Sequence, residues 1–119
     1  MKHLAKAVFI VGMILGYGQA LAAEEGHMAG QQPAEFNQAY MKAMDQMHGP
    51  MMTGIMDADP DAAFVKGMIP HHRGAVAMAE IELKYGTDPE LKKLARDIIA
   101  AQDKEIAFME AWLKKRPAK

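Results

Sequence analysis

Two Asp-Pro pairs constrain the fold of this chain more than any other feature. Asp59-Pro60, within "DADPD", and Asp88-Pro89, within "TDPE", each place a carboxylate directly before a proline. Aspartate is a favoured residue for capping a helix start, and proline is favoured at the first helical position. The two pairs therefore predict that one helix begins at about residue 60 and another at about residue 88. Gly86 is a natural residue just past the end of the earlier helix.

The predicted fold class is an all-α, antiparallel helical bundle. Two long helices should span about residues 60–85 and 88–115, and a Met-rich helix should cover about residues 33–56. Gly49-Pro50 predicts that this first helix is broken. The short connections at 57–59 and 86–88 require neighbouring helices to be antiparallel. No alternating β-branched run or Asn-Gly turn indicates a strand.

The N-terminus has the pattern of an export signal. Lys2 and Lys6 precede a short apolar run at residues 7–16, and Ala20-Leu21-Ala22 supplies small residues for cleavage. We therefore expect a signal peptide at 1–22, a flexible arm at 23–32 and a helical metal-binding domain at 33–116. This organisation predicts a periplasmic or secreted protein with no membrane attachment after cleavage, although an uncleaved anchor is the alternative.

Composition narrows the classes of function. Without Lys2 and Lys6 the formal net charge falls from −1 to −3, and no basic stripe suited to nucleic acid is present. The chain has no cysteine, so neither disulfides nor thiolate ligands are available. Ten of its 12 methionines lie after the signal, which indicates either an adaptable packing surface or a set of thioether ligands. So small a domain buries a limited core, which is compatible with a homodimer that extends the bundle.

The segment "VKGMIPHHRGAVAM" (65–78) contains the main candidate ligands. At the α-helical period, Met68, His71 and Met78 form one stripe, while His72 borders the apolar core stripe. Of the two histidines, this placement favours His71 as a ligand. Pro70 removes one helical hydrogen bond, and we expect it to bend the helix and re-aim the two imidazole rings.

Two polar residues interrupt the apolar face of the last helix. Gln102 and Glu105 lie among leucine, isoleucine and methionine residues, where an unbonded amide or carboxylate would be costly. Antiparallel pairing places both near the level of residues 68–72, so we expect them to hydrogen-bond to the imidazoles and orient them. A structural His–Glu/Gln network without metal is the alternative.

The first helical segment adds further soft donors. Met44 and His48 lie on one stripe, with Met51 and Met52 just beyond. Packing alone can account for these methionines. Together with the histidines, however, they form a thioether and imidazole donor set that suits Cu(I) and Ag(I), whereas zinc would prefer thiolates or several histidines.

The sequence lacks the residues that other common metal sites and catalytic sites require. A di-iron carboxylate site needs Glu-x-x-His on each of two helices, and methionine and isoleucine stand three residues before His71 and His72. There is no Cys-x-x-Cys-His for c-type haem, no phosphate loop and no nucleophile–base motif. We therefore expect a binding protein rather than an enzyme.

Residues 59–113 resemble the CopM-like family of small secreted bacterial proteins, which is placed in the ferritin-like superfamily. The resemblance is carried by the Met-x-x-His-His core at 68–72 and by the Met-Ala that follows at 78–79. It implies a ferritin-like bundle with ligands at Met68, His71, His72 and Met78, and it adds Met109. Some members of the family bind copper or silver and are linked to metal tolerance.

The sequence thus predicts an exported Cu(I)- and Ag(I)-binding protein for metal buffering, tolerance or delivery. Copper efflux proteins or copper chaperones would be its partners. The alternative is a periplasmic helical adaptor whose methionines form a partner-binding groove and bind no metal.

Overall fold

The computed structural model describes residues 32–116, which form three helices joined by short connections. Helix α1 spans Glu35–Gly54, α2 spans Pro60–Tyr85 and α3 spans Pro89–Lys115. The predicted all-α fold is confirmed, and both long helices match their expected limits closely. Within this part of the chain, none of the helices combines the length and hydropathy that crossing a membrane requires.

The expected export signal at 1–22 lies outside the described residues, as does the expected arm at 23–32 apart from its last residue. The chain divides into two units between Gln32 and Pro33. The three helices belong to the second unit.

Both Asp-Pro pairs start helices as expected. The Asp59 carboxylate accepts a hydrogen bond from the Ala62 amide at 3.0 Å. The Asp88 carboxylate accepts from the Glu90 and Leu91 amides. Gly86 follows the end of α2, but its φ of −68° is ordinary for any residue. The expected position of Gly86 just past the helix end is confirmed, and the chain leaves α2 in an extended conformation.

The predicted break in the first helix is also wrong. Helix α1 continues through Gly49 and Pro50 to Gly54, and α2 likewise continues through Pro70. Proline removes one backbone hydrogen bond, but its fixed φ is close to the helical value. The Thr53 hydroxyl also donates to the Gly49 carbonyl at 3.1 Å. A helix supported along its length by a neighbour can therefore contain the proline.

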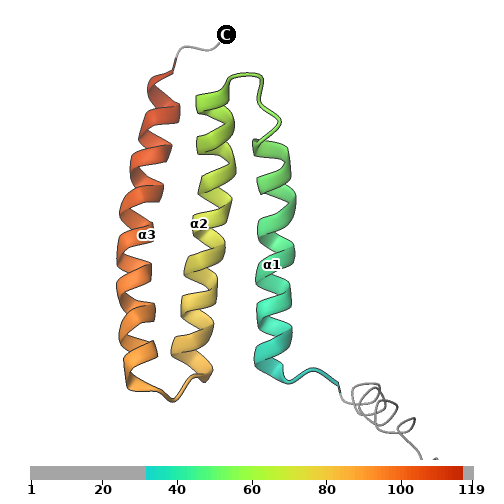
Figure 1. The fold of residues 1–119 in the computed structure, drawn as a ribbon, viewed down its shortest axis with the longest axis vertical. Coiled ribbons are helices and arrows are strands. Elements are labelled where there is room, and N and C mark those ends of the chain that lie inside the picture. Colours follow the sequence, from blue (N-terminus) through green and yellow to red (C-terminus); the bar gives the residue numbers. More distant parts are fainter. Residues whose placement is uncertain (1–31, 117–119) are drawn as a thin grey trace, which may run out of the picture. The chain divides into compact units, whose positions relative to one another are not determined.

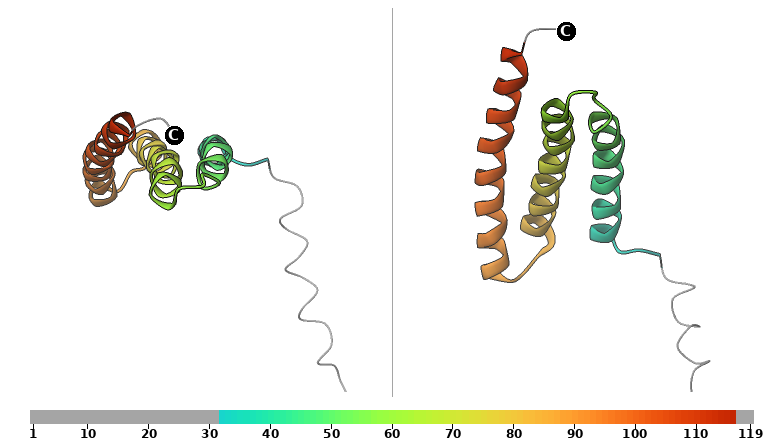
Figure 2. Two further views of the ribbon diagram at one scale, coloured as in Figure 1. Left: turned by 90° about the horizontal axis from the view of Figure 1, so that it is seen from above. Right: turned by 45° about the horizontal axis from the view of Figure 1, so that its top comes forward.

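The helices lie side by side in a single layer, with α2 between α1 and α3 (Figures 1 and 2). Each outer helix packs on α2 in antiparallel orientation, and within residues 32–116 the two outer helices do not pack on each other. Helix α2 is therefore covered on two opposite sides, and the layer has two broad faces that no other described element covers.

The α1–α2 interface is built from small residues. Ala43, Gly54, Gly67 and Gly74 are all buried. A Cβ atom on Gly54 would lie 2.3 Å from the Lys66 carbonyl oxygen, so the two backbones nearly touch at this point. At the other end of the interface, the Tyr85 hydroxyl donates to the Glu35 carboxylate at 2.6 Å.

The α2–α3 interface holds the main apolar cluster. Val65, Ile69 and Met109 are buried there, and Met68, Trp112 and Leu113 pack around them. Arg116 fastens the end of α3 to the start of α2 through two hydrogen bonds to the Asp59 carboxylate, at 2.7 and 2.9 Å. Even so, no side chain of residues 32–116 is less than 2% exposed, because a single layer cannot enclose a core.

Acid should weaken the connection between α1 and α2. The pKa of Asp57 is lowered from its ordinary value of 3.8, first by the hydrogen bond from the Lys66 ammonium group and then by the Asp59 amide. A carboxylate whose pKa is lower in the folded than in the unfolded state stabilises the fold at any pH above its unfolded pKa. This stabilisation is lost as the pH falls through the pKa of the folded state. We expect the urea midpoint to fall as the pH drops below 3.8, and to fall less steeply in Asp57→Asn. Equal slopes in both proteins would contradict this.

Candidate metal site

His72 is the only polar residue in the buried core of the described chain, with 7% of its surface exposed. Its Nε2 atom lies 2.5 Å from Oε2 of Glu105 on α3. Because a carboxylate can only accept, the imidazole donates its Nε2 proton in this hydrogen bond. The expected hydrogen bond between an imidazole and Glu105 is therefore present. The Glu105 side chain is 63% exposed, so the carboxylate remains hydrated on its other side.

The other ring nitrogen of His72 has no partner. Its Nδ1 atom is buried and unbonded, and so is Oε1 of Gln102. The expected hydrogen bond from Gln102 to an imidazole is therefore absent. In the antiparallel register Glu105 lies level with His72, whereas Gln102 is almost one turn nearer the α2–α3 connection. In the neutral ring that donates its proton through Nε2, Nδ1 carries a lone pair. His72 therefore has an unused lone pair inside the protein, which can accept a hydrogen bond or bind a metal ion.

His72 lines a cleft of about 330 Å³ between α2 and α3. The cleft also contains two thioethers, Met68 and Met109, of which Met109 is buried and only 6% exposed. Two aromatic side chains, Phe64 and Phe108, line it as well. Neither phenylalanine belongs to the predicted site, although Phe64 lies one turn before Met68 and Phe108 lies one residue before Met109.

His71 and Met78 lie outside this cleft. His71 is exposed, and its ring centroid is 6.1 Å from that of His72 with the planes tilted by 59°. Met78 lines a different cleft, together with Tyr40 on α1 and Leu94 on α3. The two histidines therefore occupy different environments, one exposed and one in the core. Within residues 32–116, no three His, Asp or Glu side chains converge on one point.

The remaining candidate ligands lie on α1. Met44, His48 and Met52 are exposed, and Met51 is half-buried. They follow Tyr40 at three- to four-residue intervals and so lie on the same side of α1. Tyr40 and Met78 line the same cleft. This side of α1 and the exposed side of α2 that carries Met78 therefore belong to one continuous surface.

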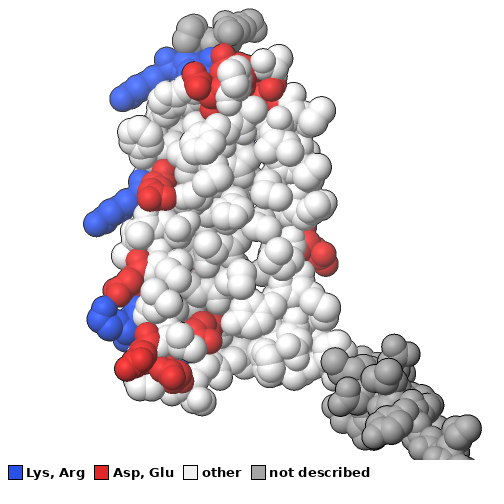
Figure 3. All heavy atoms as spheres, viewed as in Figure 1, with Lys and Arg blue, Asp and Glu red and all other residues white. Residues whose placement is uncertain are grey.

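One broad face of the layer is almost free of charge (Figure 3). Apolar side chains are exposed there on all three helices, and charged groups gather at its margins. We call it the methionine face, and it comprises Met41, Met44, His48, Met51, Met52, Ile55, Phe64, Met68, His71, Met78, Leu91, Leu94 and Phe108. Most of the predicted ligands thus share one face, although they are spread over it.

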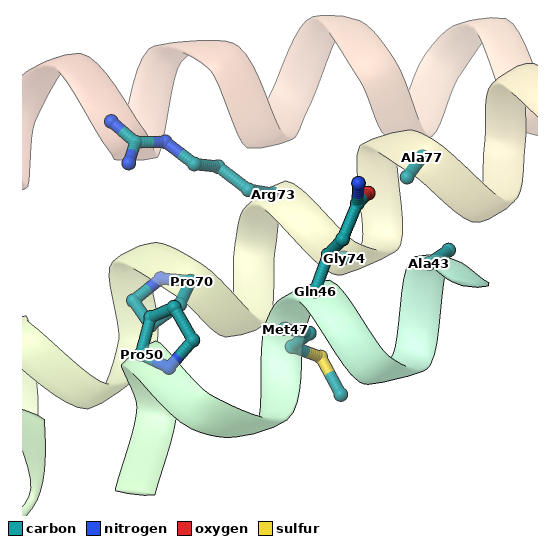
Figure 4. Close-up of a pocket in the computed structure, with 8 residues that line it drawn as sticks. All are labelled: Ala43, Gln46, Met47, Pro50, Pro70, Arg73, Gly74 and Ala77. Atoms are coloured by element: carbon teal, nitrogen blue, oxygen red, sulfur yellow. The ribbon is translucent and has the colours of Figure 1, made fainter. Parts of the chain in front are cut away.

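The opposite face has a cleft of about 270 Å³ between α1 and α2 (Figure 4). Pro50 and Pro70 lie close together at one end of it, and the Met47 side chain lies beside Gly74. Arg73 extends away from the prolines and forms an ion pair with Glu110. With one thioether and no imidazole in its lining, this cleft lacks the donors of the His72 cleft.

Comparison with known proteins gives a family but no activity. One region of 56 residues is 41% identical to an uncharacterized protein of Acanthamoeba polyphaga mimivirus. The match covers 47% of this chain and 37% of that relative, so it spans little more than a third of the relative's length. The profile of a domain of unknown function, DUF305, matches residues 11–113. The chain therefore belongs to the DUF305 family.

Proposed function

We propose that this protein binds a soft monovalent metal ion, Cu(I) or Ag(I), in the cleft between α2 and α3. His72 would bind the ion through Nδ1, and Met68 and Met109 would supply thioether sulfur. The observation that carries the proposal is the buried, unpartnered Nδ1 of His72, a residue that lines a cleft together with two methionines.

The hydrogen bonding of His72 suits a ligand. A buried polar atom without a partner costs about 1–3 kcal/mol, so such atoms are uncommon in folded proteins. Histidines that bind metals usually donate their other ring N–H to a carboxylate or carbonyl, which fixes the tautomer and the ring orientation. His72 has this arrangement, with Glu105 as the acceptor. A metal ion at Nδ1 would use the lone pair that the fold leaves unpaired.

The donor set favours soft ions. Thioethers select Cu(I) over hard cations such as Mg²⁺ and Ca²⁺, which require several oxygen ligands. Glu105 lies beyond the imidazole, where its negative charge offsets that of the cation. The rings of Phe64 and Phe108 make the cleft apolar, and the face of an aromatic ring attracts a nearby cation.

The methionine face extends this donor set. His71 lies beside the cleft, and Met78 and the α1 residues Met44, His48, Met51 and Met52 lie across the same face. These groups would bind further ions beside the one in the cleft. The proposal therefore includes metal buffering, tolerance or delivery in the periplasm or outside the cell, with copper efflux proteins or copper chaperones as partners. CopM-like membership and a ferritin-like origin of the fold are part of the same proposal, which includes no catalytic step.

A competition titration tests the thioether ligands. In the double variant Met68→Leu/Met109→Leu, we expect Cu(I) affinity to fall at least about tenfold, because leucine preserves apolar volume but has no donor atom. The control Met47→Leu/Met56→Leu removes two thioethers outside both the cleft and the methionine face and should keep the affinity within about threefold. Equal affinities in the two double variants would refute the assigned site.

The breadth of the methionine face favours a second candidate, a periplasmic adaptor that binds a protein partner without metal. In that case partner capture would be independent of metal and would tolerate Met→Leu changes at 44, 51 and 52. Under the copper proposal, the same changes should lower the number of ions bound or their affinity.

A further inference from the structure

We infer that the methionine face is a dimer interface, on which a second copy of this chain packs through the same face. The inference concerns the metal-free protein and does not depend on the proposed function.

A single layer of helices leaves the domain incomplete. Domains are generally built from at least two packed layers that bury apolar surface between them. Here α2 is covered only at its sides, and no side chain of residues 32–116 is fully buried. A second layer placed on the methionine face would enclose the exposed ends of Met68 and Met78 and complete the core.

The exposed apolar area has the size of a dimer interface. Nine large apolar side chains of the methionine face are 44–71% exposed: Met41, Met44, Met52, Ile55, Phe64, Met78, Leu91, Leu94 and Phe108. With side chains on the order of 200 Å² each, they expose on the order of 900 Å². The largest apolar patch on a typical monomer is about 300–600 Å², whereas a standard interface buries about 800 Å² per partner.

The distribution of charge fits a second copy. In a symmetric dimer each subunit presents the same patch, so a charge at the centre of the patch would approach its own copy. Most of the methionine face carries no charge, and its margins carry both signs (Figure 3). Within the face, Glu82 lines the cleft that Met78, Leu91 and Leu94 also line. Lys104 and Glu105, which line the His72 cleft, are neighbours of opposite sign. An anionic membrane is less well matched, because residues 32–116 contain 11 Lys and Arg against 13 Asp and Glu.

Sedimentation equilibrium of the metal-free full chain, with chelator present, tests the inference. The expected mass is twice the chain mass of 13.1 kDa. Leu94→Glu on α3 and Met44→Glu on α1 each place a charge in the interface and should raise the dimer dissociation constant at least about 100-fold. The control Gln46→Glu adds the same charge on the opposite face and should leave the dissociation constant unchanged. Circular dichroism establishes that each variant remains helical.

Three results would overturn the inference. A dimer that resists both Leu94→Glu and Met44→Glu would place the interface elsewhere. A monomeric full chain alongside a dimeric chain beginning at Pro33 would mean that residues 1–32 cover the face. If the full chain and the chain beginning at Pro33 are both monomeric, the methionine face would bind a different protein. Because chelator is present throughout, none of these results bears on whether the protein binds copper.

Discussion

Replacing His72 with leucine should weaken Cu(I) binding at least about 100-fold and leave the metal-free protein nearly as stable as before. Leucine is apolar and similar to histidine in size, so it fills the same space without the unpaired Nδ1 atom. Removing a buried unpaired nitrogen relieves about 1–3 kcal/mol, which offsets the lost hydrogen bond to Glu105. The largely exposed Glu105 carboxylate can be hydrated by water instead. We expect the free energy of unfolding to change by less than about 1 kcal/mol.

This pair of measurements separates a ligand from a structural histidine. If His72 and Glu105 form a structural network without metal, His72→Leu should destabilise the protein and leave Cu(I) affinity unaltered. The matched control is His71→Leu, which removes the neighbouring imidazole and should lower affinity less than about tenfold, because His71 lies outside the cleft. Glu105→Gln keeps an acceptor for Nε2 but removes the charge, and its effect should lie between those of the two histidine variants.

The sequence could predict the helices because their signals are local. Asp59 and Asp88 bond to backbone amides within three residues of themselves, so the helix starts require no knowledge of the rest of the fold. The hydrogen bond between His72 and Glu105 could also be predicted from the sequence. It joins two long helices with a short connection, whose antiparallel register can be counted from Gly86.

The arrangement of the helices was harder to predict. The side of α2 that packs on α1 consists of residues such as Gly67, Pro70 and Gly74, which give no hydrophobic periodicity. With that interface unrecognised, the helical wheel placed His71 and Met78 beside Met68 but did not separate the α2–α3 cleft from the exposed face. The misinterpretation of Pro50 as a helix break has the same origin, because α1 is supported there by its packing on α2 as well as by the hydrogen bond from Thr53 to Gly49.

Gly54→Ala tests the close approach of α1 and α2, and it should be strongly destabilising. The new Cβ would lie 2.3 Å from the Lys66 carbonyl oxygen, 2.5 Å from its carbon and 2.9 Å from the Gly67 nitrogen. These are backbone atoms of a helix, so they cannot rotate away, and the two helices would have to separate along their interface. Overpacking of this kind costs about 1–3 kcal/mol, and we expect a value near the upper limit in urea unfolding.

Gly74→Ala is the control within the same interface. Its Cβ would meet the Met47 side chain, with the sulfur atom at 2.5 Å, and a flexible thioether can change rotamer to make room. Alanine also has the higher helix propensity, so the net cost at residue 74 should stay below about 1 kcal/mol. If Gly54→Ala were equally mild, the α1–α2 backbones would not be in contact at residue 54. The methionine face would then have no rigid support on its α1 side, because the position of α1 depends on this interface.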